Sequence, residues 1–403
     1  MTVETTQLLS QRVLLMEESQ TIGMAKKARE LGAKGFDVIN LSFGEPDFPT
    51  PQHIKDAAKK ALDDGFTFYT PVAGYPDLKK AICDKFLRDN NLSFKPENIV
   101  VSTGAKQSIA NVILCLVDPG DEVVIIGPYW VSYLEIVKLA EGNGVVVGGT
   151  IENQYKPRIS DVEAAITDKT KAILYSSPSN PTGGVFNEQE LEQLADVLLR
   201  HPNVVAIADE IYEYINFLGK HFSLGAIERI KDQVVTINGL SKGFAMTGWR
   251  LGYMGAPKYI ADACDKIQGQ ITSGTCSITQ KAAIVALNSD MKPTHDMCER
   301  FRIRRDLVLE KSKEIPGFVN FVPDGAFYLF PEVSYYFGKK TENGEIIDTA
   351  MDLCMYLLNE AHVSTVPGDA FGEDNCIRIS FAAADEKLVE AFDRMKMALG
   401  KLI

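Results

Sequence analysis

The chain has 403 residues, of which 45% are hydrophobic and 24% are charged, and this composition excludes a disulfide-stapled miniprotein and a disordered chain. At about 150 residues per domain, the length predicts two or three compact units. Lysine and arginine number 42 against 54 aspartates and glutamates, which gives a net charge of −12. This sign argues against nucleic acid or an anionic membrane as a partner, so any bound anion requires a local pocket.

The seven cysteines are widely spaced, with no Cys-x-x-Cys pair and no histidine at metal-ligand spacing. We expect reduced, mostly buried thiols and no metal site.

The first twenty residues lack a basic stretch followed by an apolar one, and no run approaches the roughly 20 apolar residues of a bilayer span. The sequence therefore predicts a cytoplasmic protein.

Between residues 95 and 255, short β-rich runs alternate with amphipathic stretches. We expect strands at 98–102, 122–127, 145–149, 172–177, 204–208 and 234–239, with helices at 106–117, from Trp130 and from Asn187. This alternation predicts an α/β unit with a largely parallel sheet. Ligands of such sheets bind beyond the carboxyl ends of the strands.

The C-terminal part has a different pattern, with a long charged helix at 293–314 followed by short strands and a helix between them. The expected strands are 318–323, 326–331 and 376–381. We therefore predict a large domain at 50–295, and an N-terminal arm and small α+β domain formed by 1–49 and 296–403.

Three of the predicted strands end in polar groups that favour one shared crevice. Ser102 to Gln107 opens a helix whose free N–H groups suit a phosphate, although an ordinary capped glycine turn has the same pattern. Asn180 lies in a turn rich in proline and glycine and offers an amide to a ligand. Asp209 ends an apolar strand, as either a helix cap or a functional carboxylate.

A fourth strand end carries Ser241 and Lys242, with Arg250 eight residues later. A lysine among small residues in a loop can act as a nucleophile towards a carbonyl, and we favour this interpretation over an exposed lysine. In the strand near the C-terminus, alternation places Arg378 opposite the apolar residues, which is also typical of a solvated strand face. Val147 stands where a dinucleotide fingerprint requires glycine, and no Walker sequence is present, which argues against nicotinamide and nucleoside triphosphate ligands.

Taken in order, seven motifs resemble those of the class I aminotransferases, and most closely the aspartate aminotransferase branch of bacteria and plants. They are GEPDF from Gly44, YTPVAGYPDL from Tyr69, STGAKQ, GPYW, NPTG, DEIY and SK(x7)R. The resemblance implies the α/β fold type I of pyridoxal phosphate enzymes, with a mostly parallel seven-stranded sheet in the large domain. It also implies a homodimer with shared active sites that converts L-aspartate and 2-oxoglutarate to oxaloacetate and L-glutamate by a ping-pong mechanism. An aromatic or broad-range aminotransferase, or a β-lyase on the same fold, is the alternative.

The resemblance also implies a role for each motif in holding pyridoxal 5'-phosphate. Lys242 forms a Schiff base with the cofactor and moves the substrate proton, and Asp209 pairs with the protonated pyridine nitrogen. Asn180 and Tyr212 bind the ring oxygen, and Trp130 stacks on the ring.

For the phosphate, the implied ligands are the backbone of Gly104, Ala105 and Lys106, the side chains of Ser241 and Arg250, and Tyr69 from a second subunit. For the substrate α-carboxylate, the implied ligands are Arg378, Asn180 and the Gly44 backbone, beside Trp130. One departure is Gly239, where many relatives carry serine.

The side-chain carboxylate of a dicarboxylic substrate requires a second cation. The stretch 269–276, where some aspartate aminotransferases carry an arginine, has none. The branch that this chain resembles implies Lys106 with the hydroxyls of Ser19 and Thr21 instead. Glu17 and Glu18 stand where relatives often have Lys-Pro, and these acids either weaken binding of a second carboxylate or point into solvent.

Overall fold

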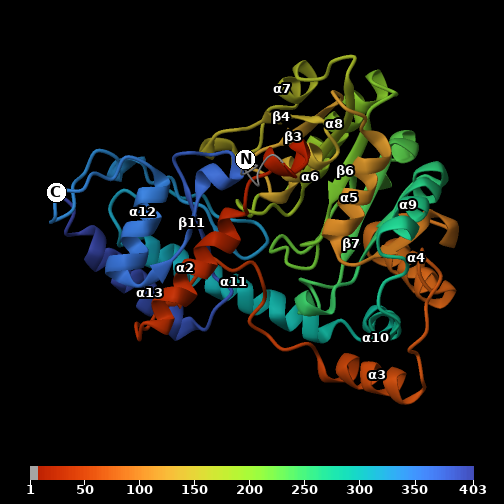
Figure 1. Cartoon of the computed structure of the whole chain (residues 1–403), viewed down its shortest axis with the longest axis horizontal. Coiled ribbons are helices and arrows are strands. Elements are labelled where there is room, and N and C mark those ends of the chain that lie inside the picture. The colour runs from red at the N-terminus through yellow and green to blue at the C-terminus, as the bar shows by residue number, and fades with distance from the viewer. Residues whose placement is uncertain (1–7) are drawn as a thin grey trace, which may run out of the picture.

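The computed structural model describes residues 8–403 and is built around a seven-stranded sheet (Figure 1). The strand order is β2-β8-β7-β6-β5-β3-β4, in which β8 is antiparallel to both neighbours and the other pairings are parallel. The predicted mostly parallel seven-stranded sheet is thus confirmed. Its strands are β2 Ile99–Ser102, β3 Glu122–Ile126, β4 Asn143–Val147, β5 Thr170–Ser176, β6 Val205–Asp209, β7 Val234–Gly239 and β8 Gly252–Gly255.

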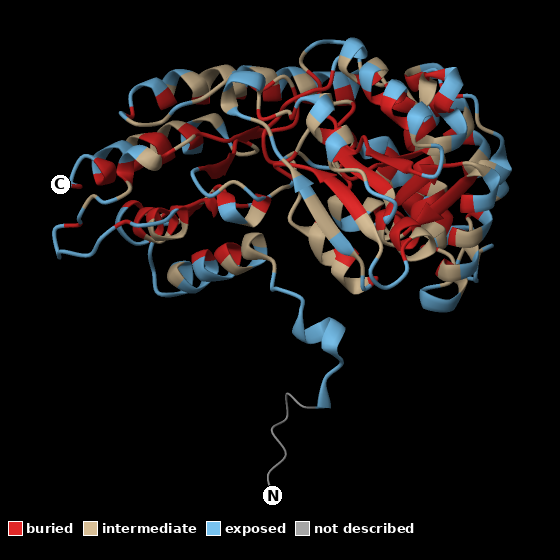
Figure 2. Ribbon diagram, turned by 90° about the horizontal axis from the view of Figure 1, so that it is seen from above, coloured by how far each residue is buried: buried red, intermediate tan, exposed pale blue. Residues whose placement is uncertain are grey.

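Helices cover both faces of this sheet, and Figure 2 shows the buried strands between the more exposed helices. One face packs against α5, α6 and α9, and the other against α7 and α8. Helix α8 begins at a capping box in which Asn187 accepts from the Glu190 amide and Glu190 accepts from the Asn187 amide. These helices are α5 Ala105–Leu116, α6 Ser132–Leu139, α7 Ile159–Ala164, α8 Glu188–Arg200 and α9 Lys258–Ile271.

Four further helices belong to the N-terminal and central parts of the chain. Helix α10 packs on α3 and α4 beside the β2 edge of the sheet. The short helix α1 projects from the body of the molecule in Figure 2 and contacts α6. The bounds are α1 Gln11–Leu14, α3 Gln52–Asp63, α4 Pro76–Asn90 and α10 Ser277–Asn288.

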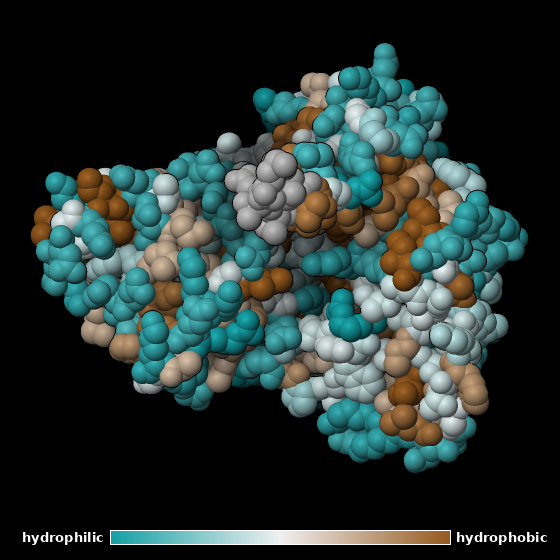
Figure 3. Space-filling view, in the orientation of Figure 1, coloured by the Kyte–Doolittle hydropathy of each residue, from teal (hydrophilic) through white to brown (hydrophobic). Residues whose placement is uncertain are grey.

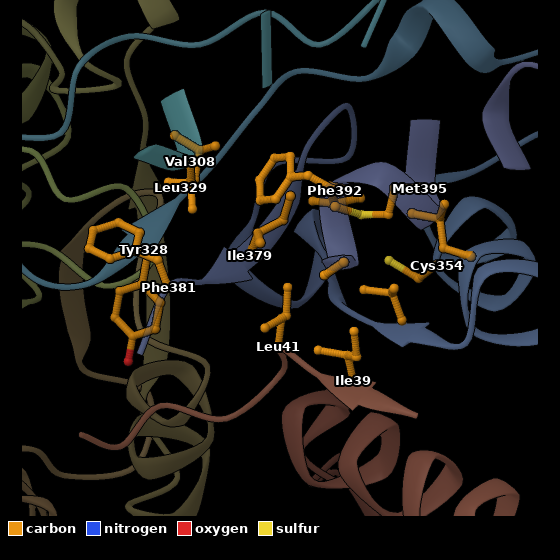
Figure 4. Close-up of a cluster of buried hydrophobic side chains, with 14 of the residues drawn as sticks. Ile39, Leu41, Val308, Tyr328, Leu329, Cys354, Ile379, Phe381, Phe392 and Met395 are labelled. Atoms are coloured by element: carbon orange, nitrogen blue, oxygen red, sulfur yellow. The ribbon is translucent and has the colours of Figure 1, made fainter. Parts of the chain in front are cut away.

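A second apolar core unites residues near both ends of the chain. Strand β1 pairs in parallel with β10, and β12 lies between β11 and β9 in an antiparallel sheet. Figure 4 shows Ile39 and Leu41 beside Ile379 and Phe392 in this core. The bounds are α2 Gln20–Ala33, β1 Ile39–Asn40, α11 Lys292–Lys313, β9 Tyr328–Leu329, α12 Ala350–Tyr356, β10 Val363–Ser364, β11 Val366–Pro367, β12 Ile377–Ser380 and α13 Asp385–Leu399.

The predicted strand at 318–323 is wrong, because this segment forms only an isolated bridge between Val319 and Glu332. Pro323 lacks the N–H that a ladder needs, and Val319 and Val322 are about half exposed, so the segment lacks a buried face. The domain division at 295 stays a prediction, and α11 runs continuously across it.

Two other expectations concern thiols and membranes. All seven cysteines, which lie within the described residues, are free; three are buried, three are half-buried and Cys276 is exposed. Within residues 8–403, no helix combines the length and the apolar character needed to cross a bilayer.

Candidate active site

A cavity of about 370 Å³ lies at the carboxyl ends of β5, β6 and β7. Its lining residues come from both ends of the chain, from Ser19 to Arg378. This is the edge at which open α/β sheets bind their ligands, and the volume is that of a small-molecule pocket. The predicted catalytic residues all line it, namely Lys242, Asp209 and Tyr212.

Lys242 follows β7 and is half-buried, with its Nζ donating a hydrogen bond to the Gly44 carbonyl oxygen. The ammonium lies 5.5 Å from the ring centre of Tyr212 and 5.7 Å from that of Phe327. Burial, and then the charge of Arg378, lower the pKa of Lys242 from its ordinary value of 10.5 to about 8. The amine can therefore gain and lose a proton near neutral pH.

Asp209 is the last residue of β6, and its carboxylate is buried. Tyr133 Oη donates to Asp209 Oδ2 at 2.6 Å, and the Ile211 amide donates to Oδ1 at 3.2 Å. Burial raises the pKa of Asp209 to about 6, against the lowering effect of these two hydrogen bonds. The carboxylate is thus held in place to accept a further hydrogen bond from a donor in the cavity.

Tyr133 was not predicted, although it lies three residues after Trp130, one helical turn away from a predicted site residue. Tyr328 was also missed, because it belongs to an apolar strand with no polar signal. The Tyr212 and Tyr328 hydroxyl oxygens are 2.7 Å apart, and the Arg378 guanidinium stacks 4.5 Å from the Tyr328 ring.

Arg378, on β12, is 1% exposed, so the structure excludes the solvated strand face that its pattern also allowed. Its Nη1 donates to Asn180 Oδ1 at 2.8 Å, and its Nη2 donates to the Ser42 carbonyl at 2.7 Å. Its buried Nε has no hydrogen-bond partner within residues 8–403, and burial lowers the pKa of the guanidinium. A buried cation without a carboxylate partner suits an anionic ligand.

The N-terminus of α5 forms an anion cradle with residues that follow β7. Gly104 caps the helix at φ +89°, a backbone conformation that favours glycine, and the absence of a Cβ lets the Arg250 guanidinium lie close to it. Ser241 and Arg250 line the cavity beside Ala105 and Lys106. The free N–H groups of the helix, a hydroxyl and a guanidinium are the donor set that a phosphate ester requires.

The Lys106 ammonium lies 4.8 Å from the ring centre of Trp130; the residue is exposed, but partial desolvation, followed by the charge of Arg250, lowers its pKa. No carboxylate within residues 8–403 forms an ion pair with it. Ser19 and Thr21 line the same cavity, and the buried Thr21 hydroxyl has no hydrogen-bond partner among the described residues. The predicted trio thus lies in one cavity.

Residues 12–17, which precede Ser19 and Thr21, contact α6 and the turn that follows it. Arg12 forms an ion pair with Glu141 at 2.6 Å, and the Glu17 amide donates to Glu135 Oε2 at 2.9 Å. Glu17 and Glu18 are exposed and do not line the cavity. The two acids therefore do not repel a second carboxylate at short range.

Tyr69, an implied phosphate ligand, and Gly239, the departure from the family pattern, are not among the residues that line the cavity. Tyr69 is 96% exposed and is not brought into the cavity of its own chain. At Gly239, a Cβ would lie 3.0 Å from both Gly252 Cα and the Leu251 carbonyl oxygen. The serine of many relatives would thus be crowded here, so the absence of its hydroxyl is consistent with close packing of β7 against β8.

The family model described as aminotransferase class I and II matches residues 37–394. The chain is 45% identical over 397 residues to a probable aspartate/prephenate aminotransferase of Rickettsia felis, covering 98% of this chain and 97% of that protein. The crystal structure of the aspartate aminotransferase from Rhizobium meliloti has a TM-score of 0.95 at 40% identity, with 98% and 99% covered. The Thermus thermophilus aspartate aminotransferase with maleate has a TM-score of 0.91 at 39% identity, with 97% and 99% covered.

The strand-end lysine, the buried aspartate and the anion cradle are thus found in a chain whose whole length matches these enzymes. This chain belongs to the class I and II aminotransferases.

Proposed function

We propose that this enzyme is an aspartate aminotransferase, which transfers the amino group of L-aspartate to 2-oxoglutarate and forms oxaloacetate and L-glutamate by a ping-pong mechanism. The observation that carries the proposal is the presence of two cations, Arg378 and Lys106, in the cavity that holds Lys242. Neither forms an ion pair with a carboxylate within residues 8–403. A dicarboxylate supplies one counter-charge for each cation, whereas a buried carboxylate without a partner would cost several kcal/mol. The relatives named for aspartate and the Thermus enzyme with maleate, itself a dicarboxylate, support the same substrate class.

The donor set fits pyridoxal 5'-phosphate, which the family implies. The N-terminus of α5 with Ser241 and Arg250 would hold the phosphate, Asp209 would accept from the ring N–H, and Asn180 and Tyr212 would bind the ring oxygen. When bound, the cofactor supplies an electron sink for the bond that breaks at the substrate Cα.

The remaining steps belong to the side chains of the protein. Lys242 would hold the cofactor, and its amine would take the proton from the substrate Cα, a role suited to an amine whose pKa is about 8. Arg378 and Asn180 bind the α-carboxylate and fix the Cα within reach of Lys242. Lys106, Ser19 and Thr21 bind the distal carboxylate, and the Trp130 ring would help to hold the cofactor.

The proposal extends to the assembly and location of the enzyme. We infer a homodimer in which Tyr69 serves the phosphate site of the partner subunit, since this residue is almost fully exposed in the single chain. A cytoplasmic location and a role in amino acid metabolism stay predictions from the sequence.

One observation favours a second candidate, an aromatic or broad-range aminotransferase. The Lys106 ammonium faces the Trp130 ring at 4.8 Å, and the rings of Tyr212 and Tyr328 line the same cavity. Such walls also accept an apolar side chain. A β-lyase differs in its products, because it would release pyruvate and ammonia.

A substrate comparison with Lys106→Met tests the proposal. We expect the variant to lose about 100-fold in kcat/KM for aspartate and less than about threefold for phenylalanine, because only aspartate has a carboxylate that loses its cation. Lys138→Met is the matched control, since Lys138 on α6 pairs with Glu135 outside the cavity. Wild-type enzyme should form glutamate from 2-oxoglutarate in equal amount to the aspartate consumed. Equal losses for both substrates would contradict dicarboxylate recognition by Lys106, and release of pyruvate and ammonia would identify a lyase.

A further inference from the structure

The segment from Ser42 to Thr50 lines the cavity with Phe43, Gly44 and Glu45. It contains no helix or strand, and within residues 8–403 no backbone–backbone hydrogen bond involves residues 42–50. Its flanks are anchored, since the Leu41 amide donates to Ser364 and the Ser380 amide donates to Leu41, while the Thr50 hydroxyl donates to the Ala245 carbonyl at 2.6 Å. The conformation between these ends therefore depends on side-chain contacts.

Two carbonyl groups of this segment touch the proposed reacting groups. The Ser42 carbonyl accepts from Arg378 Nη2 at 2.7 Å, and the Gly44 carbonyl accepts from Lys242 Nζ. A shift of the segment would thus move the carbonyl partner of Arg378, which binds the α-carboxylate. It would also move the carbonyl partner of Lys242, which takes the proton.

The strongest side-chain contact of the segment is at Asp47. Its two carboxylate oxygens accept from Arg304 Nη1 and Nη2 at 2.7 and 2.9 Å, a bidentate pair. The Arg304 side chain is only 7% exposed, and its guanidinium lies 5.0 Å from the Phe48 ring centre. Arg304 Nε also donates to Asp385 Oδ1 at 3.1 Å, at the start of α13.

We propose that Arg304 is a positioning residue, which through Asp47 fixes residues 42–47 in the conformation that orients Arg378 and Lys242 for the amino donor. A buried, bidentate arginine holds a carboxylate in both distance and plane, which a single hydrogen bond to a mobile loop does not do. Asp385 is a second carboxylate partner of the guanidinium, but it accepts a single hydrogen bond, from Nε, and does not contact residues 42–47. The inference about catalysis rests on the proposed aminotransferase function, whereas the anchoring of the segment does not.

Asp47→Asn and Asp385→Asn are compared because each removes one carboxylate from the Arg304 guanidinium; Asp385→Asn also removes the ion pair of Asp385 with Arg300. We expect Asp47→Asn to raise KM for the amino donor about tenfold with kcat reduced less than about threefold, since misplacement by about 1 Å can cost up to about 100-fold. Asp385→Asn, which leaves the bidentate pair intact, should keep the wild-type KM even where its melting temperature falls as far. Arg304→Lys, which keeps the charge without the planar fork, should resemble Asp47→Asn.

Hydrogen exchange of the Leu41 and Ser42 amides, which donate to the Ser364 carbonyl and to Asn40 Oδ1, gives a readout that requires no turnover. Exchange there should become faster in Asp47→Asn and Arg304→Lys and stay unchanged in Asp385→Asn. Equal KM values in Asp47→Asn and Asp385→Asn, or unaltered exchange in Asp47→Asn, would overturn the proposal. A wild-type enzyme without aminotransferase activity but with the expected exchange pattern would instead overturn the proposed function and leave the anchor in place.

Discussion

Lys242 lies among several cations, and their arrangement explains how its amine becomes reactive. Desolvation disfavours its charged form, and Arg378 and Arg250 add repulsion, while Glu45 and Asp209 oppose them. The result is a pKa of about 8. The same Arg378 that would bind the substrate therefore also helps to hold a neutral fraction of the amine near neutral pH.

Removal of the Arg378 charge should raise the pKa of Lys242. In cofactor-free enzyme, acetylation of Lys242 by acetic anhydride, followed by mass spectrometry, should show a midpoint near pH 8 in the wild type. In Arg378→Gln the midpoint should move upward by roughly one pH unit, because one cation in the buried site is gone. Arg305→Gln, on α11 outside the cavity, should leave it unchanged. An unmoved midpoint in Arg378→Gln would show that Arg378 does not lower the pKa of Lys242 and would leave burial and Arg250 as its causes.

At the scale of elements, the ends of β6 and α4 meet in a buried charged cluster directly behind Asp209. Lys85 on α4 forms an ion pair with Glu213, and His221 Nε2 lies 3.0 Å from Glu210 Oε2. Ser223 donates to the same Glu210 oxygen at 2.6 Å. Atoms of Glu210, Glu213 and His221 lie within 4.8 Å of one another, at a spacing that suits a metal, but the Lys85 ammonium already neutralises one carboxylate.

The charge of His221 should make this junction sensitive to pH. Burial opposes its protonation, but the carboxylates of Glu210 and Glu213 outweigh this effect and raise the pKa of His221 above 6.5, while Lys85 acts in the opposite direction. A histidine whose pKa is raised on folding contributes stability that is complete below the unfolded pKa and is lost as the pH rises through the folded pKa.

We therefore expect His221→Gln to lower the free energy of unfolding by about 3 kcal/mol near pH 5.5 and by clearly less near pH 9. Urea unfolding of the variant and the wild type at both pH values measures the difference. His295→Gln is the control, since His295 lines the adjacent cleft and forms no ion pair within residues 8–403. A deficit of the same size at both pH values would show that His221 acts through packing and not through its charge.

The elements that could be predicted from the sequence are those with a strong local pattern. Apolar β-branched runs predicted six of the seven strands of the large sheet, and the capping residue Asn187 predicted the start of α8. Strand β8 carries no such pattern because glycines begin and end it, and both are needed for packing. A Cβ at Gly252 would overlap the backbone of Ala105, and one at Gly255 would overlap the Phe94 ring.

The site residues were predicted where a motif supplied them and missed where only the tertiary structure does. Lys242 and Asp209 stand at strand ends in polar motifs, so residue type and position indicated their chemistry. Tyr328 and Arg304 lie in an apolar strand and a highly charged helix, where neighbouring residues hide them. Their contacts with Tyr212 and Asp47 join segments more than 100 residues apart, which no local pattern reports.

At the scale of the whole molecule, an acidic protein can bind anionic ligands because its cations and its acidic side chains lie in different places. The cavity collects Lys106, Lys242, Arg250 and Arg378, whereas the acidic side chains lie mainly on the surface, in ion pairs with exposed lysines and arginines. The low dielectric of the cavity strengthens these charges towards a ligand. The cavity therefore needs residues from both apolar cores. It is completed only when the two ends of the chain fold against the central sheet.

The surface beside α3 carries exposed apolar side chains that suit the proposed homodimer. Phe68 is 82% and Tyr69 is 96% exposed, and Leu62 on α3 is half exposed nearby in the chain. Figure 3 shows apolar residues at the surface over α3. Exposed aromatic and aliphatic side chains of this kind are typical of an interface, and an isologous dimer would present the loop of each subunit to its partner.

Mixing two impaired variants tests whether the sites are shared. Tyr69→Phe and Lys242→Ala, unfolded together in equal amounts and refolded, should form heterodimers in which one of the two sites has both native residues. Random pairing makes half of the dimers heterodimers, so about one quarter of the wild-type activity should return, above the residual activity of the Tyr69→Phe homodimer. Lys242→Ala mixed with the double variant Tyr69→Phe/Lys242→Ala is the control and should recover nothing. Activity of the first mixture no higher than the average of its two parents would mean that Tyr69 does not serve the site of the partner subunit.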